Sequence, residues 1–446
     1  MFTNEKSVFI MAFRTRKRPL FRVVEPTFQF LHETEASKTI TYEPDQSELL
    51  ATYGYEQREY LMSGVAARSS YCTRVLLRRP ADPLRFSGLV IEEPAHLWGG
   101  TTVWRLIDRW IMRNGHAWLG VDSQGPAAID QTKRLDPDRY KEMHFKPCPP
   151  LDDFMKPLPR IGNISNEEYL DNYGDFKTKW SVATSQSPEI LTAASHGLRN
   201  GNMEICAMGI ILCGHCQSGD VVRNFIIDSS HLHLPGGHVP FEGYMPCQSD
   251  GGPALLDMPN AKIIEVFGEQ DILWTKNLYG TVEEPIPHRR FDSGAFRLYE
   301  VPGLPHRESR YISLAELKRL SGRYFRFDGE MDKRSPRSPR SALIATIDSS
   351  EEIERDIFET AIGGVRTVHT DVPVARTIND SPKDRPHWFN GKDVAFTPTQ
   401  MLEIYKSLAN FRRQAADAIY RQVVNGFLLP EDAEILRRDA LEHVTF

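Results

Sequence analysis

The 446-residue sequence has only six cysteines, no long apolar run and little excess charge, and each shortage excludes a class of protein. The cysteines are too sparse and too irregularly spaced for a disulfide scaffold or a structural zinc module. Since no apolar run approaches the roughly 18 residues of a membrane-spanning helix, we do not expect an integral membrane protein. The net charge of −6, without a basic stripe carrying interleaved aromatics, argues against nucleic-acid binding.

The remaining composition, 40% hydrophobic and 26% charged, is typical of a globular protein with a sizeable core. At the N-terminus the apolar stretch Ser7 to Phe13 precedes the basic cluster Arg14 to Arg18, which reverses the order of a secretory signal. We therefore expect a cytoplasmic protein. The Ser-Pro-Arg repeats between Lys333 and Arg340 predict a solvated basic loop.

Strand-like apolar runs alternate with helical stretches between about residues 57 and 305, which predicts an α/β fold with a mostly parallel central sheet flanked by helices. The predicted strands are Phe86–Glu92, Ala117–Val121, Ile205–Leu212, Ala261–Phe267 and Phe296–Val301. The predicted helices of this core cover Val103–Arg113 and residues 186–200, and a third helix is predicted to begin near Ser218.

We expect an N-terminal extension over residues 1–40, followed by one elaborated domain over residues 41–446. Within it, the Pro-rich stretch 124–180 predicts a loop-rich insertion or lid. We expect residues 313–446 to form a C-terminal extension packed on the core, with a long amphipathic helix from about Pro398 to Asn425.

The segment Gly214-His215-Cys216-Gln217-Ser218-Gly219 lies where a buried strand is predicted to turn into a helix, which is the setting of a nucleophile elbow. The turn needs small residues two before and two after the nucleophile, and Gly214 and Ser218 meet that need around Cys216. Taking Ser218 as nucleophile would move it off the turn, so the register favours Cys216. The helix N-terminus behind it favours a thiolate.

Two other interpretations of these cysteines remain open. Cys213 and Cys216 form a Cys-x-x-Cys motif of the kind found in disulfide oxidoreductases, although Leu212 replaces the tryptophan that usually precedes it. Both cysteines could also serve packing alone.

A thiol nucleophile needs a base and an orienting acid, and two strand ends downstream supply them. Asp271 follows the strand Ala261–Phe267, and we choose it over Glu269; His306 follows the strand Phe296–Val301. His288 has no strand immediately before it, and the ring of His215 is expected to point elsewhere.

The oxyanion hole is expected to use the backbone N–H of Gln217 and one from Ala95 or His96, because Pro94 cannot donate. The histidines at 231, 233 and 238 have a metal-like composition, but two histidines at i and i+2 do not fix a coordination geometry. We expect no metal.

These residues resemble the α/β-hydrolase superfamily, and more narrowly its large bacterial and fungal "alpha/beta hydrolase domain" proteins, whose elbow reads Gly-x-Ser-Gln-Ser-Gly. The resemblance is nearly full length, and cysteine replaces the nucleophilic serine of the family. It extends over Glu59–Gly64, Thr73–Pro80, Gly115–Val121, the elbow, Glu269 to Asp271, Tyr299 to His306 and Gly363–Arg366.

By this resemblance Cys216, Asp271 and His306 occupy the nucleophile, acid and base positions, and dienelactone hydrolases of the superfamily use a Cys-His-Asp triad. It implies an α/β-hydrolase fold and a cofactor-independent hydrolase or acyltransferase. The enzyme would act through a thioester acyl-enzyme on an ester, lactone or thioester of a small metabolite, in secondary metabolism for example.

A lyase or cyclase that uses the same pocket for proton transfer, or a binding protein without catalysis, are the alternatives. The expected partner is a small-molecule substrate, with no nucleic acid and no membrane, and a homodimer is compatible with the sequence.

Overall fold

The structure is a computed structural model that describes residues 21–41, 46–97, 102–155, 178–249, 254–258, 260–272, 292–306, 355–378, 392–441 and 444. Several sequence predictions lie outside these residues: the extension before Phe21, residues 156–177 of the Pro-rich insertion, His288, the start of the C-terminal extension and the basic run at 333–340.

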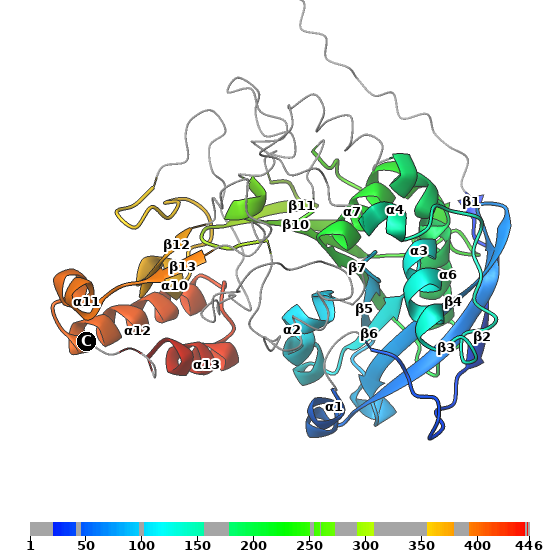
Figure 1. Cartoon of the computed structure of the whole chain (residues 1–446), viewed down its shortest axis with the longest axis horizontal. Coiled ribbons are helices and arrows are strands. Elements are labelled where there is room, and N and C mark those ends of the chain that lie inside the picture. The colour runs from blue at the N-terminus through cyan, green and yellow to red at the C-terminus, as the bar shows by residue number, and fades with distance from the viewer. Residues whose placement is uncertain are drawn as a thin grey trace, which may run out of the picture.

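A nine-stranded sheet forms the centre of the described part of the chain, in the order β11-β10-β9-β7-β5-β6-β4-β3-β2 (Figure 1). Its strands are β2 (Thr27–Phe30), β3 (Tyr55–Ala66), β4 (Ser69–Pro80), β5 (Leu89–Pro94), β6 (Ala117–Val121), β7 (Gly209–His215), β9 (Gly243–Cys247), β10 (Lys262–Gly268) and β11 (Phe296–Val301). Neighbouring strands from β6 to β11 are parallel, whereas β2, β3, β4 and β6 pair antiparallel. The predicted α/β class with a mostly parallel sheet is confirmed.

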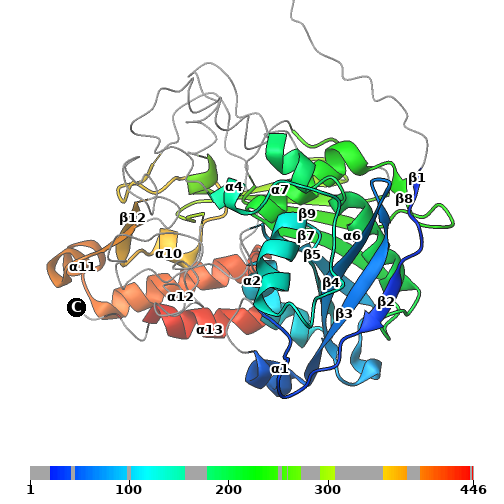
Figure 2. The ribbon, with the colours of Figure 1, turned by 45° about the vertical axis from the view of Figure 1, so that its right-hand side comes forward.

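Helices cover both faces of this sheet, as the two views in Figures 1 and 2 show. The helices of this part are α1 (Ser47–Tyr53), α2 (Thr102–Arg113), α3 (Gly125–Ala127), α4 (Asp152–Met155), α6 (Ser187–Arg199) and α7 (Gln217–Asn224), with short 3-10 or π segments at Pro83–Arg85, Ala128–Lys133 and Phe225–Ser229. On one face Leu191 of α6 and Val222 of α7 belong to the same apolar cluster as Leu212 of β7, and on the other α2 packs Trp104 against Trp118. Because parallel strands are buried on both faces, their sequences read as continuous apolar runs.

Several of the observed strands are not among the five predicted from the sequence. Residues 27–30, expected in the N-terminal extension, form the edge strand β2 on β3, and a further short pair joins β1 (Phe21–Arg22) to β8 (Leu232–His233). Strand β9 was not predicted, because it contains Gly243 and Pro246, which are disfavoured in strands.

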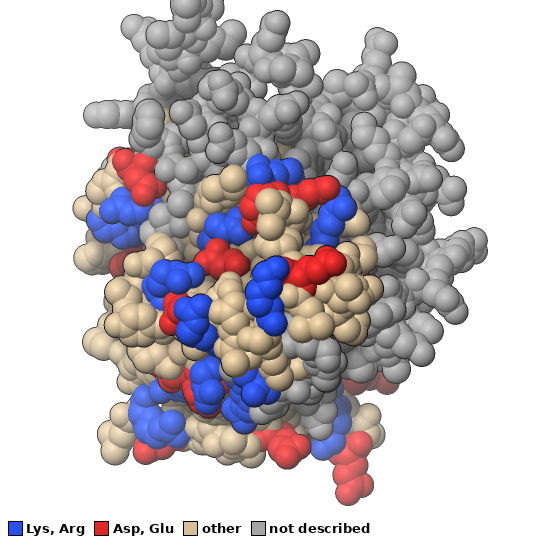
Figure 3. Space-filling view, turned by 90° about the vertical axis from the view of Figure 1, so that its left-hand side faces the viewer, with Lys and Arg blue, Asp and Glu red and all other residues tan. Residues whose placement is uncertain are grey.

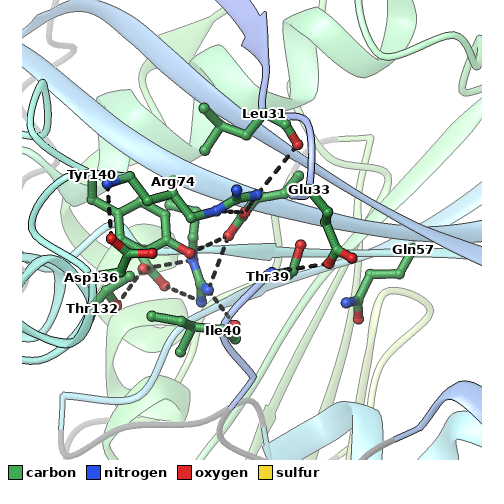
Figure 4. A network of polar contacts seen from close by, with 12 residues as sticks. Leu31, Glu33, Thr39, Ile40, Gln57, Arg74, Thr132, Asp136 and Tyr140 are labelled. Carbon is green, nitrogen blue, oxygen red and sulfur yellow. Dashed lines mark hydrogen bonds and ion pairs between the residues drawn. The ribbon is translucent and has the colours of Figure 1, made fainter. Parts of the chain in front are cut away.

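A buried polar network ties the segment 31–40 to the sheet and to the start of the insertion (Figure 4). The Arg74 guanidinium lies 3.1 Å from the Asp122 carboxylate and 3.4 Å from that of Glu59. Glu59 also accepts from Tyr140 at 2.7 Å and pairs with Arg139. Charges buried to this extent persist only when paired and hydrogen-bonded, so the network fixes how these segments meet.

The C-terminal residues form a unit with its own apolar cluster. Its elements are α10 (Val368–Asp371), β12 (Ala375–Ile378), β13 (Lys392–Ala395), α11 (Pro398–Tyr405), α12 (Leu408–Val424) and α13 (Pro430–Leu441). The unit contacts the core where Arg113 of α2 binds both carboxylate oxygens of Asp432 at 2.8 and 2.9 Å. On the face of the molecule that includes these helices, basic and acidic side chains are interspersed (Figure 3).

The single C-terminal helix predicted from Pro398 to Asn425 is wrong, because the chain breaks between α11 and α12. Lys406 adopts a left-handed φ of 65°, and the Ser407 hydroxyl accepts from the Asn410 N–H to cap the new helix. Within the described ranges, no helix combines the length and apolar character needed to cross a membrane.

Candidate active site

Cys216 lies on the tight turn between strand β7 and helix α7. Its φ of 58° and ψ of −128° are rare for a residue with a side chain, and its N–H donates to the Cys247 carbonyl of β9 at 2.9 Å. Such backbone strain persists only where the surroundings enforce it. The turn therefore presents the Cys216 thiol at the carboxyl end of a central parallel strand, where α/β proteins place ligands.

Small neighbours make this turn sterically feasible. A Cβ on Gly214 would lie 2.2 Å from the Ser218 carbonyl oxygen, and one on Gly219 would lie 2.8 Å from that of Cys247. Ser218 is fully buried, and its hydroxyl bonds the N–H and carbonyl of His215 at 2.9 Å each. Ser218 thus closes the turn. The second close approach is at Gly219, one residue beyond the position predicted from the sequence.

The three residues selected as a triad are brought together. Nε2 of His306 lies 2.8 Å from Sγ of Cys216, and Nδ1 of His306 bonds Oδ1 of Asp271. The three come from the ends of β7, β10 and β11, whose carboxyl ends meet at one edge of the sheet. The arrangement has the order required of a nucleophile, a base and an acid that orients the base.

The protonation of His306 follows from its surroundings. Burial by itself would lower the pKa of the His306 imidazole, but the negative charges and hydrogen bonds of Cys216 and Asp271 outweigh it and hold the pKa well above its usual value. The surroundings of His306 therefore favour its imidazolium form.

The contacts of Asp271 and Glu269 show which of the two carboxylates faces His306. Oδ2 of Asp271 accepts from the Gly268 N–H at 2.8 Å and from the Gln248 side chain at 3.0 Å, leaving Oδ1 facing His306. Glu269 instead accepts from Arg355 at 2.5 Å and from the Gly303 N–H at 2.7 Å. Glu269 thus holds neighbouring chain segments and does not face the imidazole.

The oxyanion-hole expectation needs one correction. The Ala95 N–H donates to the Val121 carbonyl at 2.8 Å, because the end of β5 still pairs with β6, so Ala95 is not the second donor. The Leu97 N–H donates to the Gln217 side chain at 2.8 Å, and His96 of the predicted pair stays a prediction. Gln217 itself opens α7, where first-turn N–H groups have no partner within the helix.

A buried pair of side-chain amides, which was not predicted from the sequence, joins the elbow to this loop. Nε2 of Gln217 donates to Gln124 at 2.7 Å, and Nε2 of Gln124 donates back at 3.0 Å and to the Ala95 carbonyl at 2.9 Å. Both glutamines are buried. The pair fixes the loop that carries His96 relative to Cys216. Gln217 stands directly after Cys216 in the sequence, but no motif indicates that its side chain would bond Gln124.

His215 does not point away from the site, so the expectation for its ring is wrong. Its ring centroid lies 5.7 Å from that of His306, and its Nε2 bonds Oε1 of Gln248 at 2.7 Å. The His215 ring bonds the Gln248 amide, whereas the His306 ring contacts Cys216, so His306 stays the candidate base.

The remaining candidates are placed apart from this chemistry. Cys213 is fully buried in the apolar cluster beneath α2, and burial raises the pKa of its thiol well above the usual value, as expected of a packing residue. His233 bonds the His231 carbonyl through Nδ1 at 2.9 Å. Among the residues that the structure describes, no three His, Cys, Asp or Glu side chains are grouped to hold a metal ion.

Comparison with known proteins gives a family match that extends along most of the chain. The model of the family described as "Alpha/beta hydrolase domain" matches residues 23–332 and 330–438. No curated protein matches the sequence.

Among solved structures, the chain is similar to the esterase Est22 at 11% identity, over 48% of this chain and 49% of that one, with a TM-score of 0.27. It is also similar to LpqC, a poly(3-hydroxybutyrate) depolymerase from Bordetella parapertussis, at 14% identity, over 63% and 100% of the two chains, with a TM-score of 0.30. Brefeldin A esterase is similar at 9% identity, over 54% and 76%, with a TM-score of 0.28. The match to Est22 thus spans about half of that protein.

One assignment follows from the elbow at the end of β7, from Asp271 and His306 at the ends of β10 and β11, and from a family match over most of the sequence. The chain belongs to the alpha/beta hydrolase domain family.

Proposed function

We propose that this protein is a hydrolase or acyltransferase that uses Cys216, His306 and Asp271 as a catalytic triad on an ester, lactone or thioester of a small metabolite. The observation that carries the proposal is the continuous contact from Cys216 Sγ through the His306 ring to Asp271, at the turn of a strained elbow. Membership of an alpha/beta hydrolase family supports the reaction class.

In the first half of the reaction the Cys216 thiolate attacks the substrate carbonyl carbon, and a C–S bond forms while the carbonyl π electrons move to oxygen. Backbone N–H groups of Gln217 and His96 stabilise the oxyanion. When the tetrahedral intermediate collapses, the bond to the leaving oxygen or sulfur breaks, and the His306 imidazolium gives its proton to the leaving group. The product is a thioester on Cys216.

In the second half, His306 takes a proton from water, and the oxygen attacks the thioester carbonyl. Collapse releases the carboxylic acid and regenerates the thiolate–imidazolium pair. An amine, alcohol or thiol can replace water, because a thioester transfers its acyl group readily; acyl transfer is then the outcome. No step requires a cofactor.

Turnover of a panel of small activated esters, lactones and thioesters in ¹⁸O-labelled water tests the proposal. We expect one ¹⁸O in the acid product and loss of turnover in Cys216→Ala. Product formed without ¹⁸O and without transfer to an added nucleophile would indicate a lyase or cyclase, and retained turnover in Cys216→Ala would exclude the triad. Tight binding of a metabolite without turnover would indicate a binding protein.

A further inference from the structure

We infer that Gln248 is a positioning residue for the triad, which holds the Asp271 carboxylate and links it by hydrogen bonds to His215. The inference deepens the proposed function, because it assigns to that same site two residues that do not themselves react. It depends on the contacts of one buried side-chain amide with the acid, with the loop of the base and with a second imidazole.

The backbone fixes the place of Gln248. It follows directly after strand β9, its N–H donates to the Val266 carbonyl of β10 at 2.6 Å, and its side chain is buried. Its φ of 46° is in the left-handed region, which a residue with a side chain rarely adopts. A strained conformation at the end of a central strand, next to the proposed acid, is the setting in which a functional constraint is expected.

The hydrogen bonds define the orientation of the amide. Nε2 faces two acceptors, Oδ2 of Asp271 at 3.0 Å and the Pro305 carbonyl at 2.9 Å, so both of its protons are donated. Oε1 therefore faces His215, whose Nε2 at 2.7 Å must carry a proton to donate. The resulting chain of hydrogen bonds runs from His215 through Gln248 and Asp271 to His306.

These contacts position both the candidate acid, Asp271, and the candidate base, His306. Together with the Gly268 N–H at 2.8 Å, Gln248 fixes Oδ2, so that Oδ1 of Asp271 is directed at the imidazole. The Pro305 carbonyl precedes His306 in the chain, so the same amide also holds the loop that carries the base. Without it, the Asp271–His306 bond loosens, the imidazolium loses stabilisation, and a smaller fraction of Cys216 is thiolate at a given pH.

The test is the rate of Cys216 alkylation by iodoacetamide between pH 5 and 9, in the full-length protein, for wild type, Gln248→Met and Gln248→Asn. The first variant keeps the volume and removes the amide, and the second keeps the amide and shortens its reach. We expect both to raise the midpoint of the alkylation profile by about one pH unit. At pH 6 alkylation should slow by about tenfold, as expected from loss of a hydrogen bond to a charged group.

Two further variants separate positioning from a general structural effect. Gln422→Met makes the same change at a buried glutamine in the C-terminal unit, whose side-chain amide donates to the Arg366 carbonyl at 3.3 Å, and it should leave the profile unchanged. His215→Phe should shift the midpoint in the same direction by less. Combined with Gln248→Met it should add nothing, because His215 acts through the amide.

An unchanged midpoint in both Gln248 variants, with the wild type still reacting faster than a free thiol at pH 6, would overturn this inference and leave the proposed function intact. A wild-type Cys216 that reacts like a free thiol at every pH would overturn both. A shift in Gln422→Met as large as that in Gln248→Met would show that the effect is structural and would also overturn the inference.

Discussion

Sγ of Cys216 lies 2.8 Å from Nε2 of His306, on an elbow whose backbone adopts a φ of 58°. The contact joins the end of strand β7 to a loop 90 residues further along the chain. It depends on the strained turn at Cys216 and on the His306 imidazole, whose pKa is raised well above its usual value by Cys216 and Asp271. It also depends on the Asp271 carboxylate, which accepts hydrogen bonds from the Gly268 N–H and the Gln248 side chain. Each dependence can be tested separately.

The elbow should not tolerate a side chain at Gly214. In Gly214→Ala the added Cβ would meet the Ser218 carbonyl oxygen at 2.2 Å and the Gly219 nitrogen at 2.7 Å, so the turn must open. We expect stability to fall by about 2–3 kcal/mol, as in overpacked sites, and Cys216 alkylation to slow by about 100-fold. Gly294→Ala is the matched control, because a Cβ added there would have no neighbour within 4 Å. Equal alkylation rates in the two variants would contradict this account of the turn.

The Gln124–Gln217 pair should matter for acylation more than for substrate binding. In Gln124→Met the loop that carries His96 loses its hydrogen bonds to the elbow, and the proposed oxyanion donor of that loop moves out of place. We expect kcat/KM to fall by at least about tenfold with little change in KM, because the lost interaction is made in the transition state. Gln29→Met on the exposed edge strand β2 is the control. A rise in KM at unchanged kcat would instead indicate a role in substrate binding.

Glu92 should make the protein less stable as the pH rises. Its carboxyl is fully buried with neither oxygen hydrogen-bonded, and burial raises its pKa well above the usual value. Below about pH 4.3 the carboxyl is protonated in both the folded and the unfolded chain, and it contributes no pH dependence. Above that pH only the unfolded chain ionises, and stability falls by about 1.4 kcal/mol per pH unit until the folded pKa is passed.

Glu92→Gln should remove this slope and be more stable than wild type at pH 8, as measured by urea denaturation between pH 5 and 8. Glu403→Gln, at an exposed position on α11, should leave the slope unchanged. A wild-type slope that survives in Glu92→Gln would assign it to other groups.

The network in Figure 4 should dominate the stability of the N-terminal half. Glu59→Gln leaves the buried guanidinium groups of Arg74 and Arg139 facing a neutral amide, and breaking a buried ion pair in this way costs about 3–5 kcal/mol. Thermal unfolding measures the loss. Glu434→Gln, which removes an exposed pair with Arg437, should cause no measurable change. A small effect of Glu59→Gln would mean that the network is dispensable for folding.

Much of the fold and the placement of the candidate triad residues could be predicted from the sequence because each depends on local signals. Buried parallel strands read as apolar runs, and their carboxyl ends meet at one edge, so the strand ends alone indicated that Asp271 and His306 lie near Cys216. Strand β9 could not be predicted, because Gly243 and Pro246 obscure it, although it positions Gln248.

Other details depend on contacts between segments distant in the chain. Whether Ala95 or His96 donates to the oxyanion depends on the Val121 carbonyl of the neighbouring strand, which takes the Ala95 N–H. The roles of Gln124 and Gln248 depend on buried amide hydrogen bonds that no spacing in the sequence encodes. The break at Lys406 depends on a single left-handed residue and a serine cap.

The most direct test of the central claim is intact-protein mass spectrometry during turnover of an activated ester, quenched in acid at early times. We predict an acyl adduct on Cys216 that accumulates and decays in the wild type, is absent in Cys216→Ala, and forms at least about 100-fold more slowly in His306→Ala. An adduct on another residue, or turnover without any adduct in the wild type and undiminished in Cys216→Ala, would contradict covalent catalysis by this cysteine.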